Sequence, residues 1–286
     1  MLKKNLPALA IYLVLMIIAM YNVRAFLIEP TLMAFSMMPG LTKIGLAVLV
    51  SSILFMIIAA YSLIEKKNQR SFFILIGISM LGFIFVAKAS QVIILAIFPV
   101  FVIGLLWFYQ LNYRFQPWLN MIVKSGLIAL SFLFLLIFDA AFYRTYFAEQ
   151  HNLALFLLKI ISAYALLIAL YFMIEKVLSD MYSNFKSKQT IGSFTETYSL
   201  GYAKILATIL IILLTMAVAY LQFLQLSNDA MMPFLYLLLL IQFPFFIILI
   251  LLYLPSSKEI YQILSVLMHV VLIGATAAIP VLYYSA

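Results

Sequence analysis

Nine apolar segments of membrane-spanning length dominate this sequence and restrict it to folds that use lipid as a solvent. They cover about residues 7–28, 43–64, 71–88, 90–110, 119–141, 153–174, 200–224, 233–254 and 262–284. A helix needs about 20 mostly apolar residues to cross a bilayer, where it must satisfy its own backbone hydrogen bonds. Because 67% of the 286 residues are hydrophobic and 9% are charged, a water-soluble fold could not bury this surface. We expect an all-α polytopic membrane protein with residues 1–286 forming a single transmembrane domain.

The basic residues between these segments predict the orientation. Short cytoplasmic loops of membrane proteins carry an excess of Lys and Arg. With the N-terminus in the cytoplasm, one side of the membrane collects most of the cations, among them Lys66, Lys67, Arg70 and Arg114, whereas the other holds only Arg24, Lys43, Lys88 and Arg144. The pattern predicts nine spans with the N-terminus inside and the C-terminus outside, in the plasma (inner) membrane.

Several functional classes are disfavoured by composition. The chain has no cysteine, which excludes disulfides, thiolate metal sites and a cysteine nucleophile. The net charge of +8 is spread over loops, where it serves topology and contacts with lipid headgroups, so we do not expect nucleic acid as a partner. The glycines are scattered and form no phosphate-binding loop. His151 and His269 lie too far apart in sequence to suggest a metal site.

Two polar stretches on the predicted cytoplasmic side carry the candidate chemistry. The first, 65–70, could hold a diphosphate through Lys66, Lys67 and Arg70, although it also fits a tight turn whose cations fix topology. The second, 174–194, is the longest polar stretch of the chain, and its Lys186 and Lys188 could bind either a phosphate or anionic lipid. Carboxylates are sparse on this side, and Mg²⁺ prefers several oxygen ligands.

Charged residues inside the apolar segments form a separate group. Lys124 lies about one turn inside the fifth segment, Asp139 lies near the other end of that segment, and Lys159 lies in the sixth. Such residues are a default hypothesis for function. Pairing between helices explains them equally well here, with Asp139 facing Lys159 and Arg24 facing Glu29.

Four short motifs resemble the UbiA family of intramembrane prenyltransferases. "MYNVRAFLIEPTL" is similar to the exit of that family's first helix, and "IIAAYSLIE" to the end of its second. "WFYQLNYRFQPWLN" resembles the segment between its fourth and fifth helices and places Tyr109, Arg114 and Asn120. "ALYFMIEKVLSDMYSNFKSKQTIGSF" resembles the run into its second Asp-rich motif and places Thr190. The resemblance implies a nine-helix UbiA-like bundle that binds Mg²⁺ and a prenyl diphosphate.

The Asp-rich motifs of that family are largely replaced in this sequence. In the first motif, Glu65 stands at the first Asp position, whereas Asn68 and Phe72 stand at the next two. In the second motif, Lys176, Ser179 and Ser183 occupy the Asp positions, and Asp180 is one residue out of register. The metal ligands that the resemblance implies are therefore reduced to Glu65, Asn68 and Asp180.

Two functional hypotheses follow, and the sequence leaves open whether the chain is an enzyme. In the first, it transfers an isoprenoid from a prenyl diphosphate to a lipid or aromatic acceptor, with Mg²⁺ at Glu65 and Asp180 and with Lys67, Arg70, Arg114, Lys186 and Lys188 on the diphosphate. In the second, it is an inactive relative without a cofactor that binds an isoprenoid lipid or scaffolds a membrane protein partner. A transporter ranks below both, because no inverted repeat is visible.

Overall fold

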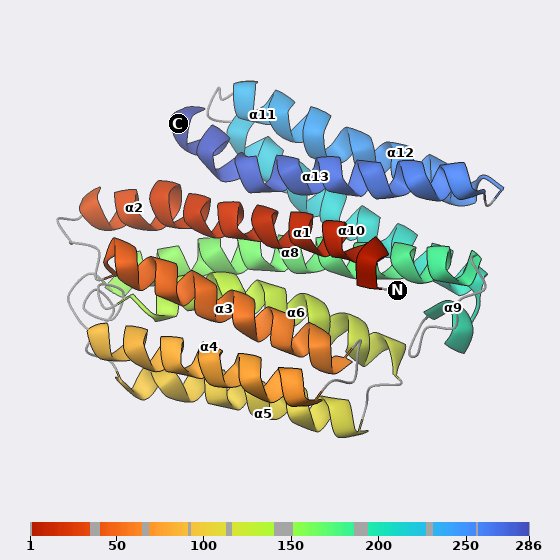
Figure 1. Cartoon of the computed structure of the whole chain (residues 1–286). Coiled ribbons are helices and arrows are strands. Elements are labelled where there is room, and N and C mark those ends of the chain that lie inside the picture. The colour runs from red at the N-terminus through yellow and green to blue at the C-terminus, as the bar shows by residue number, and fades with distance from the viewer. Residues whose placement is uncertain are drawn as a thin grey trace. The chain divides into compact units, whose positions relative to one another are not determined.

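Every regular element that the structure describes is a helix. The structure is a computed structural model that describes residues 2–34, 41–64, 69–90, 93–112, 116–139, 151–185, 194–226, 231–255 and 257–285, and Figure 1 shows its helices and no strand within these ranges. Eight helical segments in this part of the chain are long and apolar enough to cross a membrane: Ile11–Met33, Lys43–Ser62, Gln69–Ala89, Pro117–Ile137, His151–Asn184, Leu200–Phe223, Met231–Tyr253 and Glu259–Tyr284. The chain is therefore a polytopic helical integral membrane protein.

The fourth predicted span is shorter than the others. It begins with a 3-10 turn, η2 (Ile93–Ala96), and continues as α5 (Ile97–Asn112), whose strongly apolar part is Ile97–Tyr109. A helix of 16 residues rises about 24 Å, which is less than the hydrocarbon core of about 30 Å. That α5 crosses the membrane therefore stays a prediction, and so does the total of nine spans.

The chain divides into two compact units. Unit 1 contains Met1–Arg114 and Gly126–Ala165, and unit 2 contains Phe115–Ser125 and Leu166–Ala286. The helices α6 (Pro117–Ile137) and α8 (His151–Phe185) each contribute to both units. The organisation of residues 1–286 as a single domain stays a prediction.

Unit 1 is built around a closely packed antiparallel helix pair. Besides η2, α5 and parts of α6 and α8, unit 1 contains α1 (Leu2–Val23), η1 (Arg24–Ile28), α2 (Glu29–Ala34), α3 (Lys43–Ile64) and α4 (Gln69–Ala89). The helices α3 and α4 lie side by side (Figure 1), and the hydroxyl of Ser79 donates to the carbonyl of Ser52 at 2.7 Å. A Cβ atom at Gly82 would lie 1.9 Å from the Ser52 Oγ, so glycine permits this close approach. Small residues at the contact are typical of helix pairs in lipid.

Unit 2 packs its helices through tyrosine and glutamine side chains as well as apolar ones. Its elements besides parts of α6 and α8 are α9 (Phe194–Thr197), α10 (Leu200–Leu226), α11 (Met231–Leu237), η3 (Leu238–Gln242), α12 (Phe243–Tyr253) and α13 (Lys258–Ser285). The Tyr171 hydroxyl donates to the Met268 carbonyl at 2.8 Å, which joins α8 to α13. The Tyr236 hydroxyl donates to the Gly274 carbonyl at 2.7 Å, which joins α11 to α13. These bonds satisfy polar groups that lipid would leave without partners.

Two turns of π-helix interrupt the α-helical spans, and each is followed by a proline. The turn η1 closes with the amide of Glu29 donating to the carbonyl of Arg24, and Pro30 follows. The turn η3 closes with the amide of Phe243 donating to the carbonyl of Leu238, and Pro244 follows. A proline lacks the amide hydrogen and its ring collides with the carbonyl four residues earlier. The backbone therefore widens in the turn that precedes each proline.

The helix α8 is longer than the sequence analysis predicted. The sixth apolar segment was expected to end near residue 174, but the helix continues to Phe185, into the long polar stretch. No glycine or proline occurs between Glu175 and Ile191, and Glu, Lys, Leu and Met are good helix formers. The first half of that stretch is therefore a polar extension of a spanning helix.

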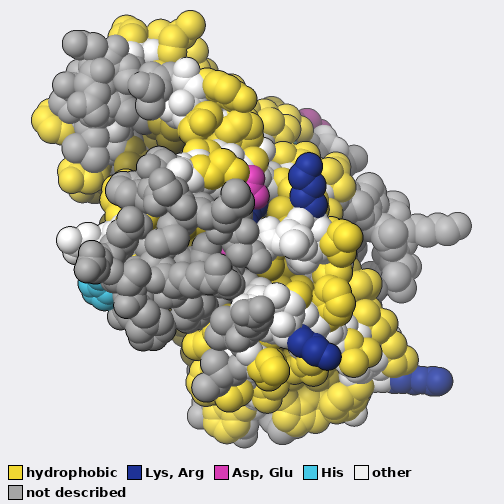
Figure 2. All heavy atoms as spheres, turned by 90° about the vertical axis from the view of Figure 1, so that its left-hand side faces the viewer, with side chains coloured by type: hydrophobic (Ala, Val, Ile, Leu, Met, Phe, Trp, Pro, Cys, Tyr) yellow, Lys and Arg dark blue, Asp and Glu magenta, His cyan; other side chains and the backbone are white. Residues whose placement is uncertain are grey.

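The described surface is predominantly apolar. Large hydrophobic side chains are exposed on most of the spanning helices, including Leu81 at 71% and Met232 at 74%. In the view of Figure 2, hydrophobic side chains cover most of the described surface, with few Lys and Arg side chains among them. Such a surface suits lipid, because apolar side chains facing hydrocarbon carry no hydration cost.

Candidate functional site

The polar extension of α8 carries a charged pair on one face. Lys176 and Asp180 are four residues apart, which places them one above the other on a helix, and they form an ion pair. The side chain of Asp180 is 3% exposed and that of Lys176 is 16% exposed. The pair is largely withdrawn from the surface of unit 2, so each charge depends on the other for compensation.

Asp180 also anchors the short helix α9. The amide of Phe194 donates to Asp180 Oδ2 at 3.2 Å, and the Thr195 hydroxyl donates to the Asp180 carbonyl at 3.3 Å. The ring of Phe194 is fully buried and meets Trp118, at the start of α6, edge to face at 5.1 Å. The two carboxylate oxygens of Asp180 thus accept from Lys176 and from the first amide of α9, respectively.

A group of ionisable side chains surrounds Glu175, and we call it the polar cluster. It consists of Lys124 on α6, Glu175, Lys176 and Asp180 on α8, and His269 on α13. The other four residues lie close enough to Glu175 to interact with it electrostatically. All five belong to unit 2. His269 is held by its own helix, because its Nδ1 lies 2.6 Å from the Ser265 carbonyl oxygen. The cluster thus combines side chains of both signs, with two lysines, two carboxylic acids and one histidine.

Asn120 lies one helical turn before Lys124 on the same face of α6. Its side chain is 3% exposed, and its Oδ1 accepts no hydrogen bond from any residue in the described ranges. A buried carbonyl oxygen without a donor costs about 1–3 kcal/mol. Such an atom beside a cation inside a spanning helix is typical of a place where a ligand or a water completes the hydrogen bonding.

Only one of the three predicted Mg²⁺ ligands, Asp180, lies within the described residues. Among them, no group of three His, Cys, Asp or Glu side chains could hold a metal ion. The predicted metal ligand Asp180 uses its two carboxylate oxygens for Lys176 and the Phe194 amide. The Lys176 ammonium supplies a positive charge next to this carboxylate. The other two predicted metal ligands, Glu65 and Asn68, lie outside the described residues.

The structure describes four of the predicted site residues. Arg70 is exposed at the start of α4 and Tyr109 is buried on α5, both in unit 1. Asn120 and Asp180 are both buried in unit 2. The remaining positions lie outside the described residues, namely Glu65, Lys67, Asn68, Arg114, Lys186, Lys188 and Thr190.

Three members of the polar cluster were not among the predicted site residues: Lys124, Glu175 and His269. The useful signal was the presence of ionisable residues inside apolar segments, which default to a functional hypothesis. Lys124 falls four residues after Asn120, and Glu175 lies five residues before Asp180, so both occur near predicted site positions. To group these residues, one must know which helices face one another, and the sequence does not show this.

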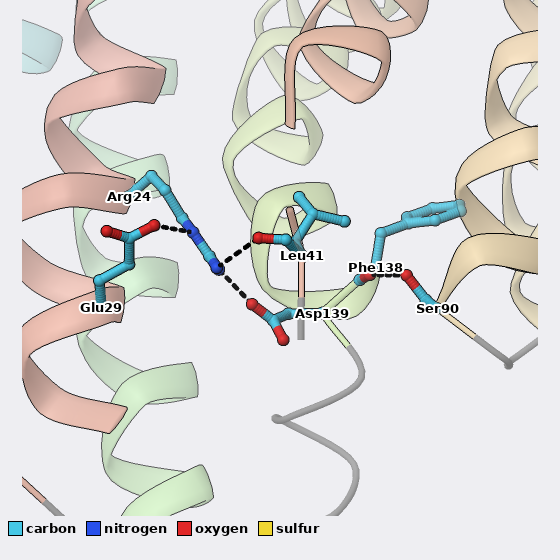
Figure 3. A network of polar contacts seen from close by, with 6 residues as sticks. All are labelled: Arg24, Glu29, Leu41, Ser90, Phe138 and Asp139. Atoms are coloured by element: carbon cyan, nitrogen blue, oxygen red, sulfur yellow. Dashed lines mark hydrogen bonds and ion pairs between the residues drawn. The ribbon is translucent and has the colours of Figure 1, made fainter. Parts of the chain in front are cut away.

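A second buried network, in unit 1, corrects one expected pair. Arg24 donates through Nε to Glu29 at 3.0 Å, through Nη1 to Asp139 and through Nη2 to the Leu41 carbonyl at 3.5 Å (Figure 3). The Arg24–Glu29 contact confirms one predicted pair. Asp139, which was expected to face Lys159, pairs instead with Arg24, whereas Lys159 is exposed. The turn η1 begins at Arg24, and this network ties it to the end of α6.

The backbone next to Asp139 is fixed by a separate bond. The Ser90 hydroxyl, just after α4, donates to the Phe138 carbonyl at 2.9 Å (Figure 3). The rings of Phe83 and Phe138 lie 5.3 Å apart in the same region. The segments at Arg24 and Ser90 are therefore both joined to residues 138 and 139, after the end of α6, so the network helps to hold unit 1 together.

Comparisons with known proteins add no relative. No protein-family model matches the chain, and neither a curated protein nor a solved structure matches it.

Proposed function

We propose that this chain is a UbiA-like membrane protein that binds an isoprenoid lipid carrying a phosphate or hydroxyl head, without Mg²⁺-dependent transfer. The proposal includes nine spans, with the N-terminus inside and the C-terminus outside, in the plasma membrane. It places the polar cluster and Asn120 on the cytoplasmic side. Membrane lipids surround the protein in this proposal, and a protein partner is compatible with it.

The engagement of Asp180 is the observation that carries the proposal. A Mg²⁺ ligand must offer oxygen lone pairs to the metal, and metal-diphosphate chemistry needs several such oxygens. Asp180 accepts from Lys176 and from the Phe194 amide, where it holds α9 in place, and the adjacent Lys176 ammonium opposes a second cation at this carboxylate. Its role is that of a structural anchor, which favours the binding function over the transferase.

The polar cluster supports a lipid with a polar head. Lys124 supplies a cation within a spanning helix, and the Asn120 Oδ1 lacks a donor among the described residues. A phosphate oxygen is suited to the lysine, and a hydroxyl or protonated phosphate oxygen is suited to the asparagine. The hydrocarbon tail of such a lipid would lie along the apolar spans that carry these residues.

The test is a titration of the purified protein in detergent with geranylgeranyl diphosphate, with Mg²⁺ and with a chelator in its place. We expect the same affinity in both conditions. Lys124→Gln should weaken binding about tenfold, because a hydrogen bond to a charged group is lost. Lys159→Gln, which changes an exposed lysine of unit 1, is the matched control and should leave the affinity unchanged.

Asp180→Asn separates the two hypotheses. The amide keeps an acceptor for Phe194 and removes the negative charge, so binding without Mg²⁺ should persist. Binding that needs Mg²⁺ and disappears in Asp180→Asn would support the transferase instead, and acceptors should then be screened. If the protein bound no lipid in either condition, the proposed lipid-binding function would be wrong. The remaining hypothesis would then be a scaffold for a membrane protein partner.

A further inference from the structure

A shallow groove runs along the outside of the α3/α4 pair in unit 1. Its volume is about 470 Å³, which lies within the range of about 300–1,000 Å³ typical of ligand pockets. Its lining is mostly apolar and comes from both helices, including Ile44, Ala47, Ser51 and Phe55 of α3 and Ile78 and Gly82 of α4. This site is separate from the polar cluster, which lies in unit 2.

The sequence of the two helices explains the shape of the groove. Ala47 and Ser51 are small, one turn apart on α3, and Gly82 has no side chain on α4. The larger side chains of Ile44, Phe55 and Ile78 stand around them. The helices α3 and α4 touch at Ser52 and Gly82, and both of these residues line the groove together with the larger ones.

The groove begins at a cation and extends into the apolar part of a span. Lys43 lines the groove, is exposed, and is the first residue of both α3 and the apolar span Lys43–Ser62. A lysine at the end of a span places its ammonium among lipid headgroups. From Lys43 to Phe55 the helix rises roughly 18 Å, close to half of a hydrocarbon core of about 30 Å. The groove thus matches the depth of one leaflet.

We propose that this groove holds an anionic phospholipid of the surrounding bilayer, with its phosphate on Lys43 and one acyl chain along α3 and α4. An apolar channel one leaflet deep, opening at a cation, matches a lipid that has a negative headgroup and an extended chain. A basic residue near the membrane surface favours anionic lipid by about fivefold. The lipid would cover the exposed small residues Ala47 and Ser51 and exclude neighbouring helices from this face.

The experiment measures phospholipid retained by the intact purified protein, using native mass spectrometry in detergent. Phosphatidylglycerol and phosphatidylcholine with the same acyl chains are titrated separately. We expect phosphatidylglycerol to bind about fivefold more tightly, and Lys43→Gln to remove this difference. The matched control is Lys88→Gln, which changes an exposed lysine at the same end of the antiparallel pair that does not line the groove. If both variants lost the preference for phosphatidylglycerol equally, the preference would come from unspecific surface charge, and the proposal would be overturned.

A second pair of variants tests the acyl chain. Ser51→Phe fills the groove and should lower retention of both lipids, whereas Ile84→Phe adds a ring at an exposed position of α4 outside the groove and should not. Unchanged retention in Ser51→Phe would overturn the proposal. Equal affinity for the two lipids together with sensitivity to Ser51→Phe would overturn the assignment of the headgroup to Lys43. A second copy of the chain on this face would appear as a dimer that Ser51→Phe dissociates, which would also contradict the lipid.

Discussion

Arg24 and Asp139, which lie 115 positions apart in the sequence, form an ion pair in which the side chains are 1% and 0% exposed. The pair joins the first span to the end of α6, and Glu29 supplies a second carboxylate that is partly exposed. Removing one partner of a buried pair leaves a charge that lipid and protein cannot solvate. This relationship makes Arg24 the central cation of unit 1.

The first prediction concerns the stability of this network. Asp139→Asn should lower the free energy of unfolding by about 3–5 kcal/mol, because Arg24 then loses its buried counter-charge. The midpoint of thermal unfolding in detergent measures the effect. Glu29→Gln is the matched control, and it should cost about 1 kcal/mol or less because that carboxylate is 36% exposed.

A double substitution checks the reason for the loss. Arg24→Met combined with Asp139→Leu removes both charges, so it should be less destabilising than the sum of the two single changes. Strict additivity would contradict a direct pairing of these residues.

The sequence predicted the spans well because the length of an apolar segment is itself the physical requirement. It failed at the end of α8, since a helix that leaves the lipid can continue with polar residues such as Glu175 and Lys176. It also failed to choose the partner of Asp139. Residues at matching depth are equivalent in the sequence, and only the packing of helices distinguishes Arg24 from Lys159.

The candidate site shows the same limit. An aspartate such as Asp180 fits either a metal site or the anchoring of a backbone amide, and the choice depends on the position of α9. The sequence named Asn120 through a resemblance, whereas its buried oxygen and the lysine one turn away required coordinates. The π-helical turn before Pro244 was likewise visible only as a proline in an apolar segment.

The second prediction concerns Gly274, where α13 approaches that π-helical turn. A Cβ atom there would lie 3.0 Å from both the Cβ and the carbonyl oxygen of Leu240, the residue whose carbonyl Pro244 leaves without its usual helical donor. Gly274→Ala should therefore lower the free energy of unfolding by about 1–3 kcal/mol, measured by thermal unfolding. Gly77→Ala on α4 is the control, because its new Cβ would meet no atom within 4 Å. Equal stability of the two variants would contradict the close approach.

The third prediction concerns orientation. Because the chain has no cysteine, a single introduced cysteine reports its own side of the membrane. With the N-terminus inside, Arg70→Cys at the start of α4 should be protected from an impermeant thiol reagent in intact cells, and Lys88→Cys near the end of α4 should react. Both residues are exposed, so a difference in thiol reactivity would not come from burial within the protein. The reverse pattern would invert the proposed topology and move the polar cluster to the outer side.

The fourth prediction concerns Asn120 and has opposite signs for stability and binding. Asn120→Leu replaces a buried carbonyl oxygen that accepts no hydrogen bond from the described residues with an apolar group of similar size, so the ligand-free protein should gain about 1–3 kcal/mol. The same change removes an acceptor for a hydroxyl head, so geranylgeraniol, whose hydroxyl can donate to this oxygen, should bind more weakly. Thermal unfolding and the titration measure the two effects, with Asn152→Leu at an exposed position as the control. A loss of both stability and affinity would mean that Asn120 serves the fold, whereas a gain of stability with unchanged affinity would place the ligand elsewhere.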